Sequence, residues 1–335
     1  MRELPGFEGP MAGEPPVEEV LRALQGSCTI AVATNGDLGV EALARAGLDR
    51  YASVVLTARG LGVAKPERAF FHAALARVGS SPPEAVMVGD SYGSDVVGAK
   101  GAGLKAVWFN PSRARCPLVH PVHDAEIRTL GELPDLLARP FLPDLGESLR
   151  ILREHGVPEN IVRHSLAVAA VAHHLALRLR ERGAALDPLL VHRGALLHDL
   201  DKVSSEKPAD HGVKAGRILR ELGWPELAAI AERHVLGAHP ETWEEKLVHY
   251  ADKIVEEGEV VGLEARVTAL SCRYNSQGDQ IARALPALLA LQEEVAAAAG
   301  VAAEELLGEL RELDADLPPF VAPEEPPYDR GEEGT

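Results

Sequence analysis

The sequence predicts two domains: an α/β domain with a Rossmann-like parallel sheet, followed by an all-α helical bundle. The chain has 335 residues, a length for which two domains are expected. From Val17 to about Asn110, short apolar runs that predict strands alternate with stretches that predict helices, which is the pattern of a parallel sheet covered by helices. From Leu149 to Leu313 only helical periodicity is found, broken by Gly, Pro and Asn.

The predicted elements of the first domain follow in a regular order. Strands are expected at 28–34, 53–57, 84–90 and 105–110, helices at 18–24, 40–47, 66–79 and 95–103, and one more short strand and helix within 125–140. We place the first domain at residues 1–138, a linker at 139–144, the helical domain at 145–316, and a tail at 317–335. The tail is rich in Pro, Glu and Gly, a composition that predicts disorder.

Composition excludes several classes of partner. The formal charge of −17 argues against nucleic-acid binding and against anionic membranes, although a metal ion could still hold a nucleotide substrate. No run approaches the ~18 apolar residues of a membrane span. The three cysteines are Cys28, Cys116 and Cys272, and they form no CxxC pair, as expected for free thiols in a reducing cytoplasm.

Polar side chains follow the predicted strands of the first domain. Thr34 ends one strand, Lys65 precedes a helix, and Asp90 and Asp95 follow a later strand. The carboxyl ends of parallel strands share one edge of a sheet, so these groups should converge there. Thr34 and Lys65 could hold a phosphoryl group, and Asp90 and Asp95 a magnesium ion.

Three segments of this region resemble the haloacid dehalogenase superfamily of phosphatases. "VATNGD", "AKPERAFFHAAL" and "VMVGDSYGSDVVGAKGAG" are similar to that family's second, third and fourth motifs, over about residues 17–137. The family's nucleophile is an aspartate in a DxD pair at the end of the first strand, but no aspartate precedes Thr34. The resemblance therefore implies a domain that lacks its first strand and cap. Without the nucleophile phosphoryl transfer cannot start, so we predict an inactive domain with a remnant site that binds magnesium or phosphate weakly.

Three explanations of the missing strand stay open at this point. The coding start could be misplaced, the gene could be split so that a partner chain supplies the strand, or the domain could have decayed into a scaffold. A homodimer or a strand-supplying partner is therefore among the predicted partners.

In the second domain the informative phrase is "LLHDLDK", residues 196–202. His198 and Asp199 are adjacent at the end of an apolar helix, and neighbouring helical side chains point about 100° apart. Both can reach one ion beyond the helix end if other helices supply more ligands. Lys202 lies on the same side as His198 and could approach an anion held there. The other candidate ligands are spaced along separate predicted helices: His164, His211, His234 and Asp252.

In this order the six residues resemble the HD superfamily of metal-dependent phosphohydrolases. "VRHSLAVAAVA", "GALLHDLDK", "HGVKAGRIL", "IAERHVLGAH" and "LVHYADKIV" are similar to its segments, over about residues 145–275. A weaker likeness links the two extra histidines to two-metal branches, including bacterial enzymes that hydrolyse dinucleoside tetraphosphates. His239 or His249 could replace one of the assigned ligands.

This resemblance implies one or two divalent ions of iron, manganese, zinc or magnesium, which suit imidazole and carboxylate ligands. It further implies that Asp199 bridges the ions, that a water between them attacks phosphorus, and that Lys202 stabilises the developing charge. The leading hypothesis is thus a phosphohydrolase acting on a nucleotide or another small phosphorylated metabolite. The alternative is a metal- and nucleotide-binding regulatory or scaffold protein without activity.

Overall fold

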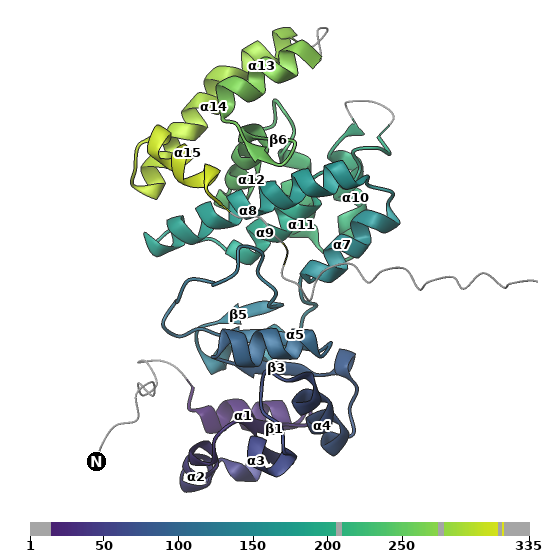
Figure 1. Cartoon of the computed structure of the whole chain (residues 1–335), viewed down its shortest axis with the longest axis vertical. Coiled ribbons are helices and arrows are strands. Elements are labelled where there is room, and N and C mark those ends of the chain that lie inside the picture. The colour runs from purple at the N-terminus through teal and green to yellow at the C-terminus, as the bar shows by residue number, and fades with distance from the viewer. Residues whose placement is uncertain (1–14, 206–209, 274–277, 314–316, 318–335) are drawn as a thin grey trace, which may run out of the picture. The chain divides into compact units, whose positions relative to one another are not determined.

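The computed structural model describes residues 15–205, 210–273 and 278–313, together with Leu317 (Figure 1). The chain forms two compact units: Met1–Pro117 with Val122–Asp144, and Leu118–Pro121 with Leu145–Thr335. The predicted disordered tail at 317–335 lies outside the described residues except for Leu317. One short segment that precedes the predicted linker, Leu118–Pro121, thus belongs to the second unit.

The first unit contains five short parallel strands in two sheets rather than in one. Strand β1 (Ala31–Thr34) pairs with β2 (Val54–Thr57), and β3 (Val86–Gly89), β4 (Lys105–Phe109) and β5 (Ala125–Ile127) form the other sheet in that order. The parallel pairing confirms the α/β prediction. Among the described residues no strand pairs with strands of both sheets. The absence of a first strand remains a prediction. A partner that supplies this strand remains a prediction.

Helices cover these sheets, and one of them differs from its prediction. The α-helices are α1 (Val17–Gln25), α2 (Asp37–Arg45), α3 (Ala58–Leu61), α4 (Arg68–Val78), α5 (Gly98–Gly101) and α6 (Leu133–Leu137). Val20 and Leu24 of α1 pack with Val107, Ile127 and Leu133 in one buried cluster. The helix predicted at 95–103 begins earlier, as a π-helical segment η3 (Tyr92–Val97) that continues into α5.

The second unit is a bundle of nine described helices (Figure 1). They are α7 (Leu145–Glu154), α8 (Glu159–Glu181), α9 (Pro188–Leu197), α10 (Val213–Glu221), α11 (Pro225–Arg233), α12 (Trp243–Ile254), α13 (Leu263–Arg273), α14 (Gly278–Ala299) and α15 (Ala303–Arg311). Helix α9 packs against α8, α11 and α12. The Asp187 side chain caps it by accepting hydrogen bonds from the amides of Leu189 and Leu190. Its last residues, Ala195–Leu197, are fully buried, so the helix ends inside the bundle.

A glycine lets α9 and α11 approach closely. A Cβ atom placed on Gly194 would lie 2.6 Å from Cδ1 of Ile230 on α11, closer than real side-chain contacts allow. A larger residue at this position would require Ile230 to move, and the C-terminal ends of the two helices lie near each other. The residues that follow those ends are His198 and His234.

The second unit departs from the all-α prediction at one place. Strands β6 (Val255–Glu256) and β7 (Glu259–Val260) form an antiparallel ribbon of two residues each. Glu257 and Gly258 between them both have positive φ angles, 51° and 95°, as a two-residue hairpin turn requires. The prediction missed this ribbon because such a short pair carries no periodic signal.

The segment Leu118–Pro121 is held by buried side chains of the helical unit. His173 on α8 donates from Nδ1 to the carbonyl oxygen of Val119 at 2.9 Å, and Arg193 on α9 donates from Nη2 to the carbonyl oxygen of Pro121 at 2.9 Å. His120 Nδ1 lies 2.9 Å from His192 Nε2. Burial lowers the pKa of His173 to about 3, so its ring is neutral.

Within the described residues no single helix is long and apolar enough to cross a membrane. Residues Arg283–Ala299 and Ala303–Arg311 pass that test only together, and they are bent by 81° at the break between them.

Candidate metal centre

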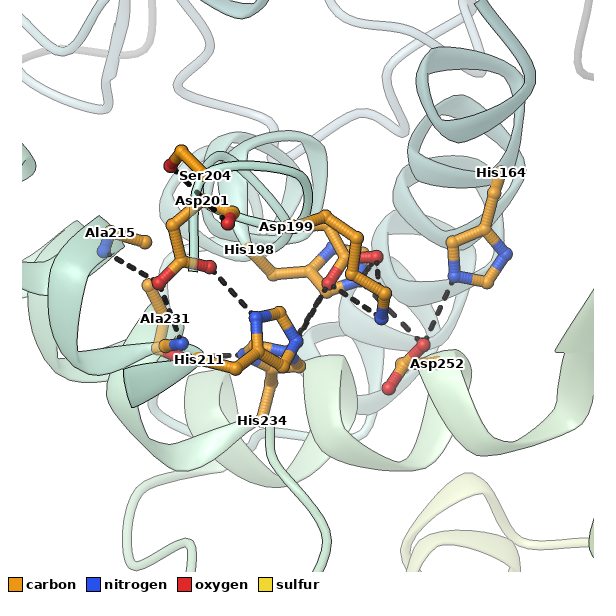
Figure 2. Close-up of polar contacts among 12 residues, drawn as sticks. His164, His198, Asp199, Asp201, Ser204, His211, Ala215, Ala231, His234 and Asp252 are labelled. Atoms are coloured by element: carbon orange, nitrogen blue, oxygen red, sulfur yellow. Dashed lines mark hydrogen bonds and ion pairs between the residues drawn. The ribbon is translucent and has the colours of Figure 1, made fainter. Parts of the chain in front are cut away.

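The six residues predicted as metal ligands lie together in the second unit (Figure 2). His164 comes from α8, His198 and Asp199 follow α9, His211 precedes α10, His234 follows α11, and Asp252 lies on α12. Their possible ligand atoms form three overlapping groups, each within 4.8 Å: His164, His198 and Asp199; His198, His234 and Asp252; Asp199, His211 and His234. Asp199 belongs to the first and last groups. We therefore divide the cluster into a His198 half, with His164 and Asp252, and a His211 half, with His234, and Asp199 contributes to both.

His198 and His234 owe their orientation to the ends of their helices. The last carbonyl groups of an α-helix have no partner within the helix. His198 donates from Nδ1 to the carbonyl oxygen of Ala195, and His234 donates from Nδ1 to that of Ala231, both at 2.6 Å. A carbonyl oxygen only accepts, so each Nδ1 carries a proton and each Nε2 is the ring nitrogen left to ligate a metal ion. The same arrangement is typical of metal-binding histidines.

The half of the cluster around His198 suits a cation. His198 Nε2 is buried and has no hydrogen-bond partner among the described residues, and it lies 3.6 Å from Asp199 Oδ2 and from Asp252 Oδ1. His164 Nε2 lies 3.0 Å from the same Oδ1 atom of Asp252. Burial lowers the pKa of His198, but Asp199 and Asp252 outweigh this effect and raise it, so that without a metal ion Nε2 carries a proton toward both carboxylates. A divalent ion would take the place of that proton. His164, His198, Asp199 and Asp252 therefore fit one metal ion.

The electrostatics of this half agree with that fit. Burial would raise the pKa of Asp199, but the neighbouring His198 and a hydrogen bond from His211 hold it well below its usual range. Burial opposes ionisation of Asp252 in the same way, and Lys253 and the histidines outweigh it. Both carboxylates are thus ionised at neutral pH, as cation ligands must be.

The other half is built around His211, which lies between two carboxylates (Figure 2). Its Nε2 is 3.1 Å from Asp199 Oδ1 and 3.1 Å from His234 Nε2, and its Nδ1 is 2.8 Å from Asp201 Oδ1. Burial lowers the pKa of His211, but its hydrogen bonds with Asp199 and Asp201 outweigh this effect and raise the pKa to about 9. Burial lowers the pKa of His234 to about 4. Asp199, His211 and His234 fit a second ion at the place where the His211 proton now lies.

Sequence reasoning missed two residues that support this cluster. Asp201 is fully buried, and its Oδ2 accepts from the amides of Gly212 at 2.9 Å and Ala215 at 3.0 Å while its Oδ1 accepts from His211. Lys253 contacts Asp252 Oδ2 and donates to the carbonyl oxygen of His234 at 3.0 Å. Each lies within two residues of a predicted ligand, but proximity in sequence alone does not show which way a side chain points.

Lys202 was predicted to contact phosphate, and His249 and His239 were alternative metal ligands. Lys202 Nζ lies 3.3 Å from both oxygens of Asp199. His249 is buried, donates from Nδ1 to the carbonyl oxygen of Arg233 at 3.0 Å, and belongs to none of the three groups. His239 is also outside them. The ligand set with His211 and His234 remains the prediction that this geometry favours.

In the first unit, two of the four predicted site residues come together. Lys65 Nζ lies 2.6 Å from Asp95 Oδ1 and donates to the carbonyl oxygen of Ala33 at 2.9 Å. Thr34 Oγ1 accepts from the amide of Gly36 at 3.2 Å. The backbone oxygen of Asp90 accepts from the indole of Trp108 at 3.2 Å. The buried ammonium occupies one oxygen of Asp95, so magnesium binding there remains a prediction.

Comparison with known proteins finds two families along the chain. Residues 13–103 match the model of the haloacid dehalogenase-like hydrolases, and residues 161–273 match the model of the HD domain. An uncharacterized protein of Methanocaldococcus jannaschii is 42% identical over 114 residues, which cover 29% of this chain and 67% of that protein.

Two relatives with named activities are phosphatases. Ribulose-1,5-bisphosphate 5-phosphatase of Halopiger xanaduensis is 38% identical over 134 residues, 37% of this chain and 56% of that protein. Phosphoserine phosphatase of Thermus thermophilus is 45% identical over 83 residues, 24% of this chain and 33% of that protein. The chain thus spans about half or less of the length of these two relatives. It belongs to the haloacid dehalogenase-like hydrolases in its first part and to the HD-domain proteins in its second.

Proposed function

We propose that the second unit is a metal-dependent phosphohydrolase that cleaves a phosphoester or phosphoanhydride of a nucleotide or small phosphorylated metabolite. The observation that carries this proposal is the buried His198 Nε2, which faces two ionised carboxylates without a hydrogen-bond partner among the described residues. The HD-domain model matches residues 161–273, which include all six residues of the cluster.

We propose separate roles for the metal ion and for the residues of the cluster. A divalent ion, when bound, would act as a Lewis acid toward phosphoryl oxygens and lower the pKa of a water molecule to about 7. Asp199 would hold both halves in register, because it contacts His211 on one side and faces His198 on the other. The backbone acceptors of His198 and His234 would keep both Nε2 lone pairs directed inward.

Lys202 would stabilise charge on the substrate. Its side chain is 41% exposed, although Nζ lies 3.3 Å from Asp199. The ammonium group can therefore turn toward a phosphoryl oxygen that arrives from solvent and remain beside the cluster. A positive charge fixed where negative charge develops favours the transition state.

We propose no catalytic role for the first unit. Its Lys65 and Asp95 satisfy each other, so that magnesium or phosphate would bind only weakly. A homodimer likewise stays a prediction.

The test is to measure metal content and phosphate release with the same purified full-length chain. Mass spectrometry would count Fe, Mn, Zn and Mg, and an assay would use nucleotides, p-nitrophenyl phosphate and bis-p-nitrophenyl phosphate. We expect His198→Ala to lose both metal and activity, whereas His155→Ala, an exposed histidine outside the cluster, keeps both. Metal without turnover on any substrate would favour the regulatory alternative, and the absence of metal would refute the site.

A further inference from the structure

Lys253 on α12 makes two contacts that join the halves of the candidate metal centre. Its Nζ atom contacts Oδ2 of Asp252, a candidate ligand of the His198 half, and donates to the carbonyl oxygen of His234, whose ring belongs to the His211 half, at 3.0 Å. The Lys253 side chain is only 9% exposed. Lys202, which also lies beside the centre, is 41% exposed. Lys253 is therefore held in place, whereas Lys202 can turn toward solvent.

The contact between Lys253 and Asp252 involves only one of the two carboxylate oxygens. Oδ2 meets the ammonium group, whereas Oδ1 lies 3.0 Å from His164 Nε2 and 3.6 Å from His198 Nε2. Figure 2 shows one oxygen of Asp252 directed toward His164 and the other directed away from it. Because Lys253 occupies Oδ2, Asp252 offers the His198 half a single oxygen.

Asp199 also offers the His198 half a single oxygen. Its Oδ2 lies 3.6 Å from His198 Nε2, whereas its Oδ1 lies 3.1 Å from His211 Nε2 and 3.5 Å from His234 Nε2. The His198 half thus presents one oxygen from each carboxylate and one nitrogen from each of its two histidines. Such a set of four suits Zn²⁺ or Fe²⁺, whereas Ca²⁺ takes about six to eight oxygens and can bind both oxygens of a carboxylate.

From this geometry we infer that Lys253 determines which ion the His198 half selects, because it restricts Asp252 to one oxygen. This inference rests on the proposed function, since it concerns the ion that the hydrolase would use. The positive charge of Lys253 repels every divalent ion to a similar extent. The loss of an oxygen ligand, in contrast, weakens most the ion that needs many oxygens. Lys253 is therefore a positioning residue, which acts through Asp252.

The test compares the Zn²⁺ and Ca²⁺ affinities of full-length wild type and Lys253→Met. Zn²⁺ binding would be measured against a competing chelator, and Ca²⁺ binding by equilibrium dialysis followed by mass spectrometry. Lys253→Met makes both oxygens of Asp252 available, so we expect the preference for Zn²⁺ over Ca²⁺ to fall about tenfold or more, the usual effect of a residue that supports a metal ligand. A loss of stability would weaken the binding of both ions alike and would cancel in this ratio. A purely structural role of Lys253 therefore predicts an unchanged preference.

Lys246→Met is the matched control. Lys246 lies about two turns earlier on α12 and also pairs with a carboxylate, that of Glu294 at 2.6 Å. Within the described part of the chain it forms no hydrogen bond or ion pair with a candidate ligand, so its removal should leave the preference unchanged. Lys253→Gln, whose side chain is uncharged and one atom shorter, is the second variant if Lys253→Met does not fold, and the same fall in preference is expected.

The outcomes separate this inference from the proposed function. An unchanged preference in the Lys253 variants, or an equal fall in Lys246→Met, would overturn the inference even if the protein hydrolyses phosphoesters. A fall in the Lys253 variants alone would support it. If the metal-loaded wild type then released no phosphate from any substrate, only the hydrolase would be refuted.

Discussion

Replacing Asp201 with Asn should remove one of the two metal sites and leave the other. In the wild type, Oδ2 of Asp201 accepts from two amides and Oδ1 accepts from Nδ1 of His211 at 2.8 Å. The Asn side chain has only one oxygen, which the two amides of Gly212 and Ala215 would take. Its NH₂ group would then face Nδ1 of His211, and a clash between two donors is avoided only if Nδ1 carries no proton. The one proton of the neutral ring would then lie on Nε2, the atom that faces Asp199 and His234.

A protonated Nε2 cannot ligate a metal ion, so the His211 half should lose affinity. Loss of such a supporting carboxylate typically costs ten- to a hundredfold in metal affinity, or about 1.4–2.8 kcal/mol. Within the described part of the chain, His164, His198 and Asp252 form no hydrogen bond or ion pair with Asp201, so their half should keep its ion.

Equilibrium dialysis against Mn²⁺, followed by mass spectrometry, measures this change directly. At a free concentration where the wild type holds about two ions, Asp201→Asn should hold about one. Glu226→Gln, an exposed residue in the first turn of α11, makes the same change of charge and should leave the count unchanged. Two ions bound to Asp201→Asn with undiminished affinity would refute the reasoning about the tautomer.

Three further predictions concern stability. Lys253→Met leaves the buried Asp252 carboxylate without its cation, so the unfolding free energy of the metal-free protein should fall by about 3 kcal/mol or more. Added Mn²⁺ should then raise the melting temperature of this variant more than that of the wild type, and equal shifts would contradict the prediction. The pKa of His173 is about 3 in the folded protein against about 6.5 for an exposed histidine, so the unfolded chain binds the proton first as the pH falls, and this group should lower the stability of the folded state by ~2 kcal/mol at pH 5 relative to pH 7 and above. Urea unfolding at both pH values should show a smaller loss for His173→Gln, and an identical loss would refute the assignment. Gly194→Ala places a methyl group 2.6 Å from Ile230 and should cost about 1–3 kcal/mol of unfolding free energy, measured by the same titration; a neutral result would mean that α9 and α11 separate easily.

Three of the six candidate ligands, His198, Asp199 and His234, follow the ends of helices, a position that sequence patterns can indicate. His198 and Asp199 stand where an apolar helix stops, and the structure places them, with His234, at the ends of helices that meet inside the bundle. These polar residues follow apolar helices and are buried, so their residue types indicated a binding site and not a solvent-exposed helix face. Ligand identity still awaits the metal measurement.

Asp201 and the ribbon β6–β7 could not be predicted in the same way. The contact between Asp201 and His211 depends on Gly212, whose φ angle of 81° turns the chain before α10 begins. His211 was predicted to lie on a helix, but it lies two residues before the start of α10. Such contacts depend on single backbone angles and on how helices pack, and neither leaves a periodic trace in a sequence.

The short segment Leu118–Pro121 has a consequence for how the chain folds as it is synthesised. It leaves the ribosome before any helix of the unit to which it belongs, and its backbone acceptors meet His173 and Arg193 only 54 and 72 residues later. Contacts so distant along the chain close slowly, because the intervening segment must first lose its conformational freedom. A fragment that begins at Leu145 would leave both buried donors without these acceptors, at a cost of about 1–3 kcal/mol each. The helical half is therefore expected to complete its folding only in the presence of a piece of chain that was made first.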